Sequence, residues 1–253
     1  MKTYDIFLDY YDKIVRSVNN PLEDEIEFLI EDCIKEYKPE TKTILETACW
    51  TWEVAKELVK KWYKVTGLDI NEKMLEKSRL PLDPPLSGGK EPQLDLVLAD
   101  MTNFDLKKKF DLLLCNYNSI CHLLTWKEWQ DFFDMSNLHL EKDWLLIFDI
   151  NTLYEFENIA RDFSQFYNFW DDTVCLEMEK SDWIFKWLVK IFKKNTSWTY
   201  DLIEESIKEN SFPINKIKKE LKDKWFEILE MIDYHYWKVT AKSERVYFIC
   251  KKK

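Results

Sequence analysis

The sequence predicts an α/β fold with a doubly wound, mostly parallel sheet, and two observations carry that prediction. Between residues 43 and 150, short apolar stretches alternate with helical patterns every ~20 to 30 residues, which is typical of βαβ units. Beyond Asn151 the rhythm changes, and longer alternating stretches indicate antiparallel strands. The length of 253 residues suits one large domain, or one domain with a substantial insertion.

The first half supplies the predicted parallel sheet. A helical pattern covers residues 4–37, with apolar side chains at helical spacing from Ile26 to Ile34, and Pro39 ends it. The remaining helices are predicted at 53–61, 72–79 and 127–140, with a Pro/Gly-rich loop at 81–92. Strands are predicted at 43–49, 63–69, 94–98, 110–115 and 145–149.

The second half adds antiparallel elements. Residues 174–180 and 184–193 are predicted to form antiparallel strands, and the polar segment 199–211 could pair in the same sheet. A helix at 214–224 precedes two strands, 226–234 and 245–250, that could form a closing hairpin. We therefore divide the chain into residues 1–150, an N-terminal helical lid and α/β core, residues 151–212, a small cap insertion, and residues 213–253, which complete the core.

Composition excludes several classes of protein. The net charge is −10, with 37 basic and 47 acidic residues interspersed, which argues against nucleic-acid binding. No run of apolar residues is long enough for a membrane span or a signal peptide. The six cysteines form no CxxC pair and have no histidine at zinc spacing, so we expect reduced, buried thiols, a cytoplasmic location and no metal.

Acidic residues follow three of the predicted strands. Glu46, Asp69 and Asp100 all fall in or just beyond a strand end. Open α/β sheets bind ligands at the carboxyl ends of their strands, near the point where strand order reverses. The pattern alone therefore predicts a ligand site at this edge.

Several segments resemble, in order, the motifs of class I S-adenosylmethionine (SAM)-dependent methyltransferases. The segment Ile44–Glu53 resembles the first motif, a strand and an acid followed by a GxGxG-type turn, with Ala48, Trp50 and Trp52 at the three glycine positions. The other matching segments are Tyr63–Asp69, Met74-Leu75, Leu98–Met101, Leu145–Asn151 and Trp225-Phe226. The resemblance implies a Rossmann-like, seven-stranded sheet with a C-terminal antiparallel hairpin, SAM as cofactor, and methyl transfer to a small acceptor.

The resemblance also implies roles for individual residues. Asp69 would accept hydrogen bonds from the ribose hydroxyls, Asp100 and Met101 would flank adenine, and Glu46 would face the amino-acid end of the cofactor. Helix capping by Asp69, a turn role for Asp100 and a solvated strand end at Glu46 are the structural alternatives. The full set of cofactor-binding candidates is Glu46, Ala48, Cys49, Trp50, Trp52, Asp69, Ile70, Met74, Asp100, Met101, Asn116, Tyr117 and, from the N-terminal lid, Tyr11.

Methyl transfer from a sulfonium is an in-line displacement that depends mainly on orientation and desolvation, so no catalytic residue is required by the chemistry. Asn116 and Tyr117, after the fourth strand, would lie over the methionine portion and the methyl group. His122 is the best placed of three isolated histidines to act as a base, although a lone histidine is more often structural. The acceptor is expected under residues 151–200, whose aromatic side chains suit a small, partly apolar molecule but also suit core packing.

Two other functions are compatible with the pattern. With glycine at positions 50 and 52, the turn and Ala55 would read GxGxxA, a nicotinamide-binding fingerprint in which Asp69 again holds a ribose. A seventh strand antiparallel to its neighbours would distinguish the methyltransferase from such an oxidoreductase. The third possibility is a non-catalytic protein whose site is blocked by Trp50 and Trp52.

The chain has 3 glycines and 12 tryptophans, the reverse of ordinary usage. Six tryptophans stand where a turn or a helix end favours glycine: Trp50, Trp52, Trp62, Trp144, Trp198 and Trp225. Some genetic codes read UGA as glycine and others as tryptophan, which suggests the hypothesis that these positions are glycines in the native protein. Trp187 fits an apolar strand, while Trp126 and Trp129 fit either reading. We expect the sequence as printed to keep the fold, with the indoles of Trp50 and Trp52 crowding the cofactor site.

Overall fold

A computed structural model describes residues 7–10, 13–14, 22–50, 53–78, 94–233, 235 and 238–253. Tyr11 and Trp52, two of the predicted site residues, lie outside the described residues, as does the loop at 81–92. Across the part of the chain that is described, no helix is long and apolar enough to cross a lipid bilayer.

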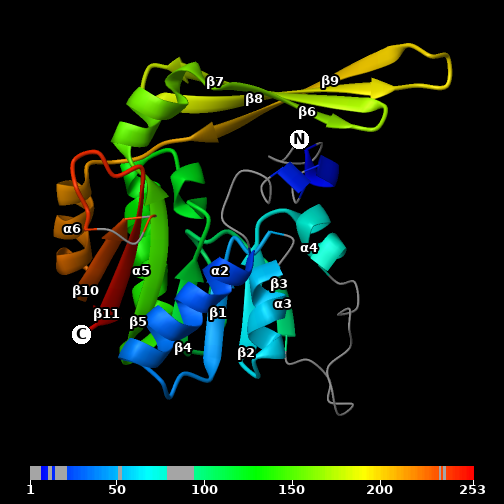
Figure 1. Cartoon of the computed structure of the whole chain (residues 1–253). Helices are drawn as coiled ribbons and strands as arrows, with labels where there is room; N and C mark the ends of the chain where they lie inside the picture. The colour runs from blue at the N-terminus through cyan, green and yellow to red at the C-terminus, as the bar shows by residue number, and fades with distance from the viewer. Residues whose placement is uncertain are drawn as a thin grey trace.

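A seven-stranded sheet forms the centre of the molecule (Figure 1), in the order β10-β11-β5-β4-β1-β2-β3. The strands from β1 to β5 are parallel, whereas β11 is antiparallel to both β5 and β10. The strands are β1 (Thr43–Thr47), β2 (Lys64–Asp69), β3 (Leu94–Leu98), β4 (Phe110–Cys115), β5 (Leu140–Asn151), β10 (Phe226–Asp233) and β11 (Arg245–Lys252).

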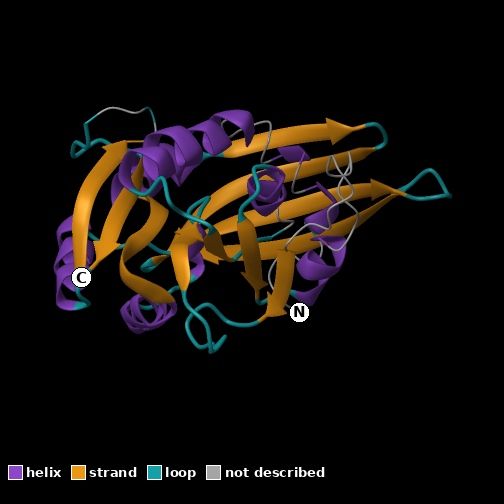
Figure 2. Ribbon diagram, turned by 90° about the horizontal axis from the view of Figure 1, so that it is seen from below, coloured by secondary structure: helices purple, strands orange, loops and turns teal. Residues whose placement is uncertain are grey.

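Helices cover both faces of this sheet (Figure 2), as the doubly wound prediction requires. Side chains of successive strand residues point to opposite faces, so each strand supplies both layers. On β4, Leu113 packs in the layer of α5 and α6, while Leu112 and Leu114 pack in the layer of α2, η1 and α3. The helices are α2 (Leu22–Glu27), the π-helix η1 (Phe28–Lys35), α3 (Glu53–Lys60), α4 (Glu72–Ser78), α5 (Trp126–His139) and α6 (Ile214–Asp223).

A second, four-stranded sheet lies beyond the carboxyl ends of the parallel strands (Figure 1). All its neighbours are antiparallel, in the order β6-β7-β8-β9. The strands are β6 (Ser164–Phe169), β7 (Asp172–Ser181), β8 (Ile184–Lys194) and β9 (Tyr200–Glu209). We call this the cap sheet. It follows β5 through two short helical turns, η3 (Glu155–Ile159) and η4 (Ala160–Asp162), and returns to the core through α6.

The predicted fold class is confirmed, and the reversed strand β11 is the arrangement that favours a methyltransferase over a nicotinamide-dependent oxidoreductase. Three details of the prediction were wrong. Strand β5 begins at Leu140 rather than at 145, because this segment also pairs with Phe110. Strand β6 was not predicted, since its polar and aromatic residues show no buried face. Part of the first helix is a π-helix. The division at 150 and 212 remains a prediction.

Asp149, near the end of β5, connects three segments of the core. Its buried carboxylate accepts hydrogen bonds from Nε of Arg245, at 2.5 Å, and from the backbone N–H of Asn118, at 2.7 Å. Arg245 opens β11, and its guanidinium also lies 3.9 Å from the buried carboxylate of Glu25 in α2. The interaction therefore holds the reversed strand and the loop after β4 against the end of β5.

Substitution Asp149→Asn is expected to lower the free energy of unfolding by about 3–5 kcal/mol, because it leaves the buried Arg245 charge without its closest carboxylate. Denaturant unfolding at neutral pH would measure this change. The control is Asp223→Asn, which removes one partner of the exposed Lys219–Asp223 pair and should leave stability unchanged within error. Equal effects of the two substitutions would contradict the role given to Asp149.

Candidate active site

The turn after β1 brings the backbone close to the end of β2. Ala48 and Trp50 both have positive φ values, 50° and 51°, so the chain bends sharply twice within three residues. The backbone N–H of Cys49 donates to the carbonyl of Leu68 at 3.0 Å. A Cβ atom added to Gly67 would lie 2.9 Å from Sγ of Cys49, so only glycine allows this approach.

Asp69 ties the turn after β1 to the loop after β2. Its carboxylate accepts the backbone N–H of Trp50 at 2.9 Å and that of Asn71 at 2.7 Å. The side chain is buried, and burial raises the pKa of Asp69 although these two N–H groups oppose the shift. Asp69 thus serves partly as the cap of the following segment, which is the structural alternative that the sequence raised. It also lines a cavity, described below.

Glu46 and Asn116 place unsatisfied polar atoms beneath the same edge. Both side chains are buried, and Oε2 of Glu46 and both side-chain polar atoms of Asn116 have no hydrogen-bond partner within the described structure. Burial raises the pKa of Glu46 to about 8, the charge of Asp69 raises it further, and the N–H of Ala55 opposes the shift. Buried polar groups of this kind are normally satisfied, so they indicate a missing polar partner.

A cavity of about 510 Å³ opens above the ends of β1 and β2, within the size range of small-molecule sites. Seven of the predicted cofactor-binding residues line it: Ala48, Trp50, Asp69, Ile70, Met74, Asp100 and Met101. Asp100 is exposed, and its carboxylate also accepts hydrogen bonds from the backbone N–H and the hydroxyl of Thr102, which is the turn role considered above. We call this space the larger cavity.

Other predicted residues lie elsewhere. Cys49, Glu46 and Asn116 are buried but are not among the side chains that line the larger cavity. Tyr117, which has a positive φ of 54°, contributes to the lining of the neighbouring cavity instead. Tyr10, from the predicted lid, donates a 2.6 Å hydrogen bond to Asp172 of the cap sheet.

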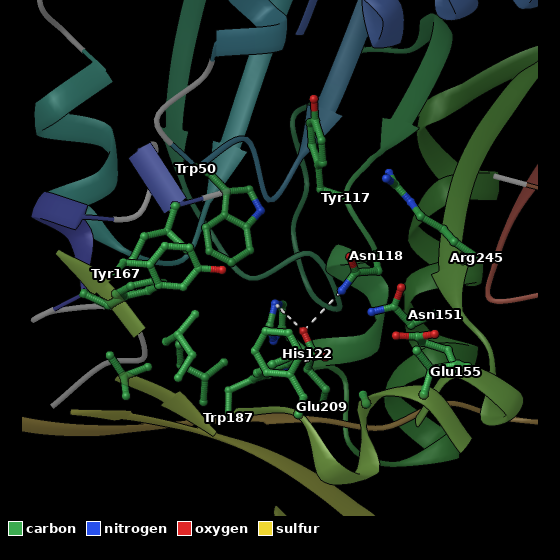
Figure 3. Close-up of a pocket in the computed structure, with 18 residues that line it drawn as sticks. Trp50, Tyr117, Asn118, His122, Asn151, Glu155, Tyr167, Trp187, Glu209 and Arg245 are labelled. Atoms are coloured by element: carbon green, nitrogen blue, oxygen red, sulfur yellow. Dashed lines mark hydrogen bonds and ion pairs between the residues drawn. The ribbon is translucent and has the colours of Figure 1, made fainter. Parts of the chain in front are cut away.

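The second cavity, about 330 Å³, lies between the carboxyl edge of the core and the cap sheet (Figure 3), and we call it the smaller cavity. Polar side chains gather on one side of it, and aromatic and aliphatic side chains form the rest. The polar residues are Asn118, His122, Asn151, Glu155, Glu209 and Arg245.

Glu209, the last residue of β9, is the centre of this polar group. Its carboxylate accepts hydrogen bonds from Nδ2 of Asn118 at 3.2 Å and from Nε1 of Trp187 at 3.0 Å. Nε2 of His122 lies 3.7 Å from the same carboxylate, and Nδ1 of His122 is 3.2 Å from the carbonyl of Lys208. Core and cap sheet therefore meet at Glu209, which is hydrogen-bonded to Asn118 and lies close to His122 (Figure 3).

Two carboxyl groups of the smaller cavity have raised pKa values. Burial raises the pKa of Glu209. The charge of His122 and the hydrogen bonds from Trp187 and Asn118 oppose this shift. Burial raises the pKa of Glu155 to about 7, with further increases from the charges of Glu244 and Glu209. Within the described residues, no cluster of three or more His, Cys, Asp or Glu side chains is arranged to hold a metal ion.

The two cavities share two residues, Trp50 and His122. The indole Nε1 of Trp50 donates to Oγ of Ser119 at 2.8 Å, and its ring lies 5.4 Å from the imidazole of His122. The indole is therefore part of the wall between the cavities, which agrees with the predicted crowding at this position. Sequence reasoning singled out His122 but missed Glu209, Glu155 and Arg245, since no local spacing relates them to the first motif.

Comparison with known proteins identifies a matching domain in this chain. Residues 44–143 match the methyltransferase domain family. A protein of Geobacillus sp. (strain WCH70) named as a methyltransferase is 25% identical over 257 residues, which cover 99% of this chain and 100% of the relative.

Solved structures share the fold over almost the whole chain. A SAM-dependent methyltransferase from Clostridium acetobutylicum ATCC 824 superimposes with a TM-score of 0.83 at 24% identity, covering 98% of each chain. An amino pentose methyltransferase from Micromonospora echinaspora, solved with SAM bound, has a TM-score of 0.76 at 16% identity and covers 96% of this chain and 97% of its own. The matched domain and the named relative support an enzyme of the methyltransferase type, and the chain shares the fold of solved SAM-dependent methyltransferases over almost its whole length.

Proposed function

We propose that the larger cavity binds SAM and that the smaller cavity binds a small acceptor with an amino group. The observation that supports this arrangement is that the two adjacent cavities share His122 and the residue at position 50. The methyl donor and the nucleophile must approach in line, so their sites must meet. The wall common to both cavities is where that meeting would occur.

In this proposal the residues at the end of the sheet hold the cofactor. Asp69 accepts hydrogen bonds from the ribose hydroxyls, because its buried carboxylate has accepting capacity beyond the two backbone N–H groups. Asp100 and Met101 flank the adenine. Glu46 and Asn116, whose buried polar atoms have no partner within the described structure, face the amino-acid end. An ammonium and a carboxylate at that end would supply the missing partners.

The chemistry of the smaller cavity favours an amine. Glu155 and Glu209 converge there with raised pKa values, so each gains stability when a cationic or hydrogen-bond-donating group binds nearby. The amino pentose methyltransferase that shares the fold acts on an amino sugar, which agrees with this inference. The aromatic part of the cavity, which includes Phe163 and Trp187, would pack against the apolar face of such an acceptor.

His122 is the proposed proton acceptor. When a neutral amine attacks the methyl carbon, a C–N bond forms, the C–S bond breaks, and the new ammonium loses a proton. His122 lines both cavities, and the carboxylate of Glu209, 3.7 Å from its Nε2, would stabilise the protonated imidazole. SAM supplies the activated methyl group, and the protein orients the two molecules and excludes water.

The proposal predicts that the protein methylates small amines in preference to matched alcohols. Mass spectrometry of incubations with SAM and paired amino and hydroxy sugars would show methylated amines only. The assays should include Trp50→Gly beside the chain as printed, since the Trp50 indole borders both cavities. Methylation of the hydroxy sugars alone would overturn the choice of acceptor.

Asp69→Asn should weaken SAM binding by about 10- to 100-fold, because a hydrogen bond to a charged acceptor is replaced by one to a neutral amide. Isothermal titration calorimetry would measure the dissociation constant. Asp95→Asn on β3 is the control, since Asp95 is exposed and pairs with Lys108. An unchanged dissociation constant in Asp69→Asn would show that Asp69 only caps the turn.

Glu46 makes SAM binding depend on proton release. The pKa of Glu46 is about 8, against an ordinary value of 4.5. In the cofactor-free protein, the contribution of Glu46 to the free energy of unfolding is therefore fully present below pH ~4.5 and is lost as the pH rises through ~8. A bound ammonium would favour the carboxylate, so binding at pH 7 should release a proton. Calorimetry in buffers of different ionisation enthalpy would detect this release, and Glu46→Gln should abolish it.

His122→Ala should lower kcat by about 100-fold or more if the imidazole accepts the proton, while SAM affinity changes much less. Raising the pH should recover part of the lost rate, because a larger fraction of the amine is then neutral and other bases can act. His235→Ala, at an exposed position between β10 and β11, is the matched control and should leave kcat unchanged. An unaltered kcat in His122→Ala would remove the residue from the mechanism.

A further inference from the structure

Tryptophan is strongly over-represented among the residues with left-handed backbone. Eleven of the described non-glycine residues have positive φ, and five of them are tryptophans: Trp50 (51°), Trp62 (74°), Trp170 (53°), Trp198 (61°) and Trp225 (66°). The chain has 12 tryptophans, of which Trp52 and Trp237 lie outside the described residues. A bulky side chain is strained in this region, whereas glycine adopts it freely.

Two of these tryptophans end helices in a motif that glycine normally occupies. After α3, the N–H of Trp62 donates to the carbonyl of Val59 at 2.9 Å, and that of Tyr63 donates to Leu58 at 3.2 Å. This pair of bonds is the Schellman motif, with Trp62 at its left-handed C′ position. After α6, the N–H of Trp225 donates to the carbonyl of Lys222 at 3.2 Å, and Trp225 occupies the same position.

Two others lie in the hairpins of the cap sheet. Phe169 pairs with Asp172, so Trp170 is the first central residue of a two-residue loop, where primed turns place glycine or asparagine. In the β8–β9 hairpin, the N–H of Trp198 donates to the carbonyl of Asn195 at 3.2 Å, and the positive φ follows a β-turn. A left-handed glycine after such a turn is the usual way to restore strand pairing.

The tryptophans fall into two groups by their surroundings. The four in helix ends and hairpins are 60%, 106%, 80% and 70% exposed at positions 62, 170, 198 and 225. In contrast, Trp129 is buried and donates from its indole to the carbonyl of Leu123 at 2.9 Å, and the Trp187 indole donates to Glu209. Trp126 makes an edge-on contact with Phe212, and the ammonium of Lys216 lies 4.0 Å over its ring. The ring of Trp198 also lies 4.2 Å from the ammonium of Lys194, so the two groups differ in exposure and in backbone conformation.

We propose that the native protein carries glycine at positions 50, 62, 170, 198 and 225, encoded by UGA, and tryptophan at positions 126, 129 and 187, encoded by UGG. Each of the five positions combines a backbone conformation that favours glycine with a turn or helix end that ordinarily contains it. The three retained tryptophans have negative φ and bury or pair their indoles.

The sequence-based set needs two corrections. Trp170 was missed, because its loop is recognisable only from the pairing of β6 with β7. The backbone does not support glycine at position 144, because the left-handed residue in that turn is Asp143, with φ of 66°. Trp183 resembles Trp144, since the positive φ of its loop belongs to Asp182. The backbone therefore gives no reason for glycine at 144 or 183.

Position 50 links this inference to the active site. Only the functional consequence of glycine at this position rests on the function proposed above. The Trp50 indole lines both cavities and is held by Ser119 and His122. Glycine there would remove the indole and leave the backbone N–H that donates to Asp69 unchanged. The two cavities would then meet beside His122, where methyl transfer requires them to meet.

The first test is the gene and the native protein. The five positions should read UGA and positions 126, 129 and 187 should read UGG. Peptide mass spectrometry of the protein purified from its own cells should show glycine at all five positions. UGG at positions 50 and 62, or tryptophan in the native peptides, would overturn the proposal whatever the enzymatic function proves to be.

The second test measures the backbone strain directly in the recombinant chain. Trp62→Gly should raise the melting temperature by about 2–4 °C, because it relieves a left-handed residue, whereas Trp62→Ala should not, because it keeps a Cβ atom. Trp183→Gly is the matched control: it removes another exposed indole where φ is not positive, and it should not raise the melting temperature. Equal changes in all three variants would contradict the inference.

The third test separates this proposal from the function. Trp50→Gly should tighten SAM binding at least ~10-fold relative to the chain as printed, measured by calorimetry, whereas Trp129→Gly should only destabilise the fold. Tight SAM binding by the printed chain with no gain in Trp50→Gly would count against glycine at position 50. SAM binding by Trp50→Gly without methylation of any amine would instead leave the glycine assignment standing and overturn the acceptor.

Discussion

The turn that crosses from β1 over the end of β2 is the constraint on which the active site depends. Two left-handed residues, Ala48 and Trp50, bring backbone N–H groups toward Asp69 and Leu68. Gly67 permits the close approach from the other strand. Because this turn sets the position of Asp69 and the opening of the larger cavity, a side chain at residue 50 affects fold and function together. The left-handed backbone at position 50 favours glycine, and the absence of a side chain there would also leave space in the two cavities.

The smaller cavity is formed by elements that are distant in the chain. His122 comes from the short helical turn η2 (Ser119–His122), Glu209 from the last strand of the cap sheet, and Arg245 from β11. Asp149 holds the last of these and the loop at Asn118 in place from the end of β5. Burial raises the pKa values of Glu155 and Glu209 there.

Natural sequences are usually consistent at every level, so that local preferences agree with the fold. Here the agreement fails mainly at one residue type. The strands, the capping box of Thr125 and Glu128, and the buried pair of Asp149 and Arg245 all support the same structure. Tryptophans at helix ends and hairpin turns oppose it. Glycine at these positions would agree with the backbone conformation. The proposed decoding of UGA as glycine would therefore affect both the stability and the activity of the protein.

The sequence by itself determined the parallel sheet and the C-terminal hairpin, and it predicted a ligand site at the carboxyl edge. Periodicity and strand-end acids are local properties, so they could be predicted from residues such as Glu46, Asp69 and Asp100. It also located Trp50 in the cofactor turn. Only the tertiary structure decided that Glu209 lies near His122, that Tyr117 lines the smaller rather than the larger cavity, and that Asp143 rather than Trp144 is left-handed. These facts depend on strand register and on contacts between distant segments, which no local pattern encodes.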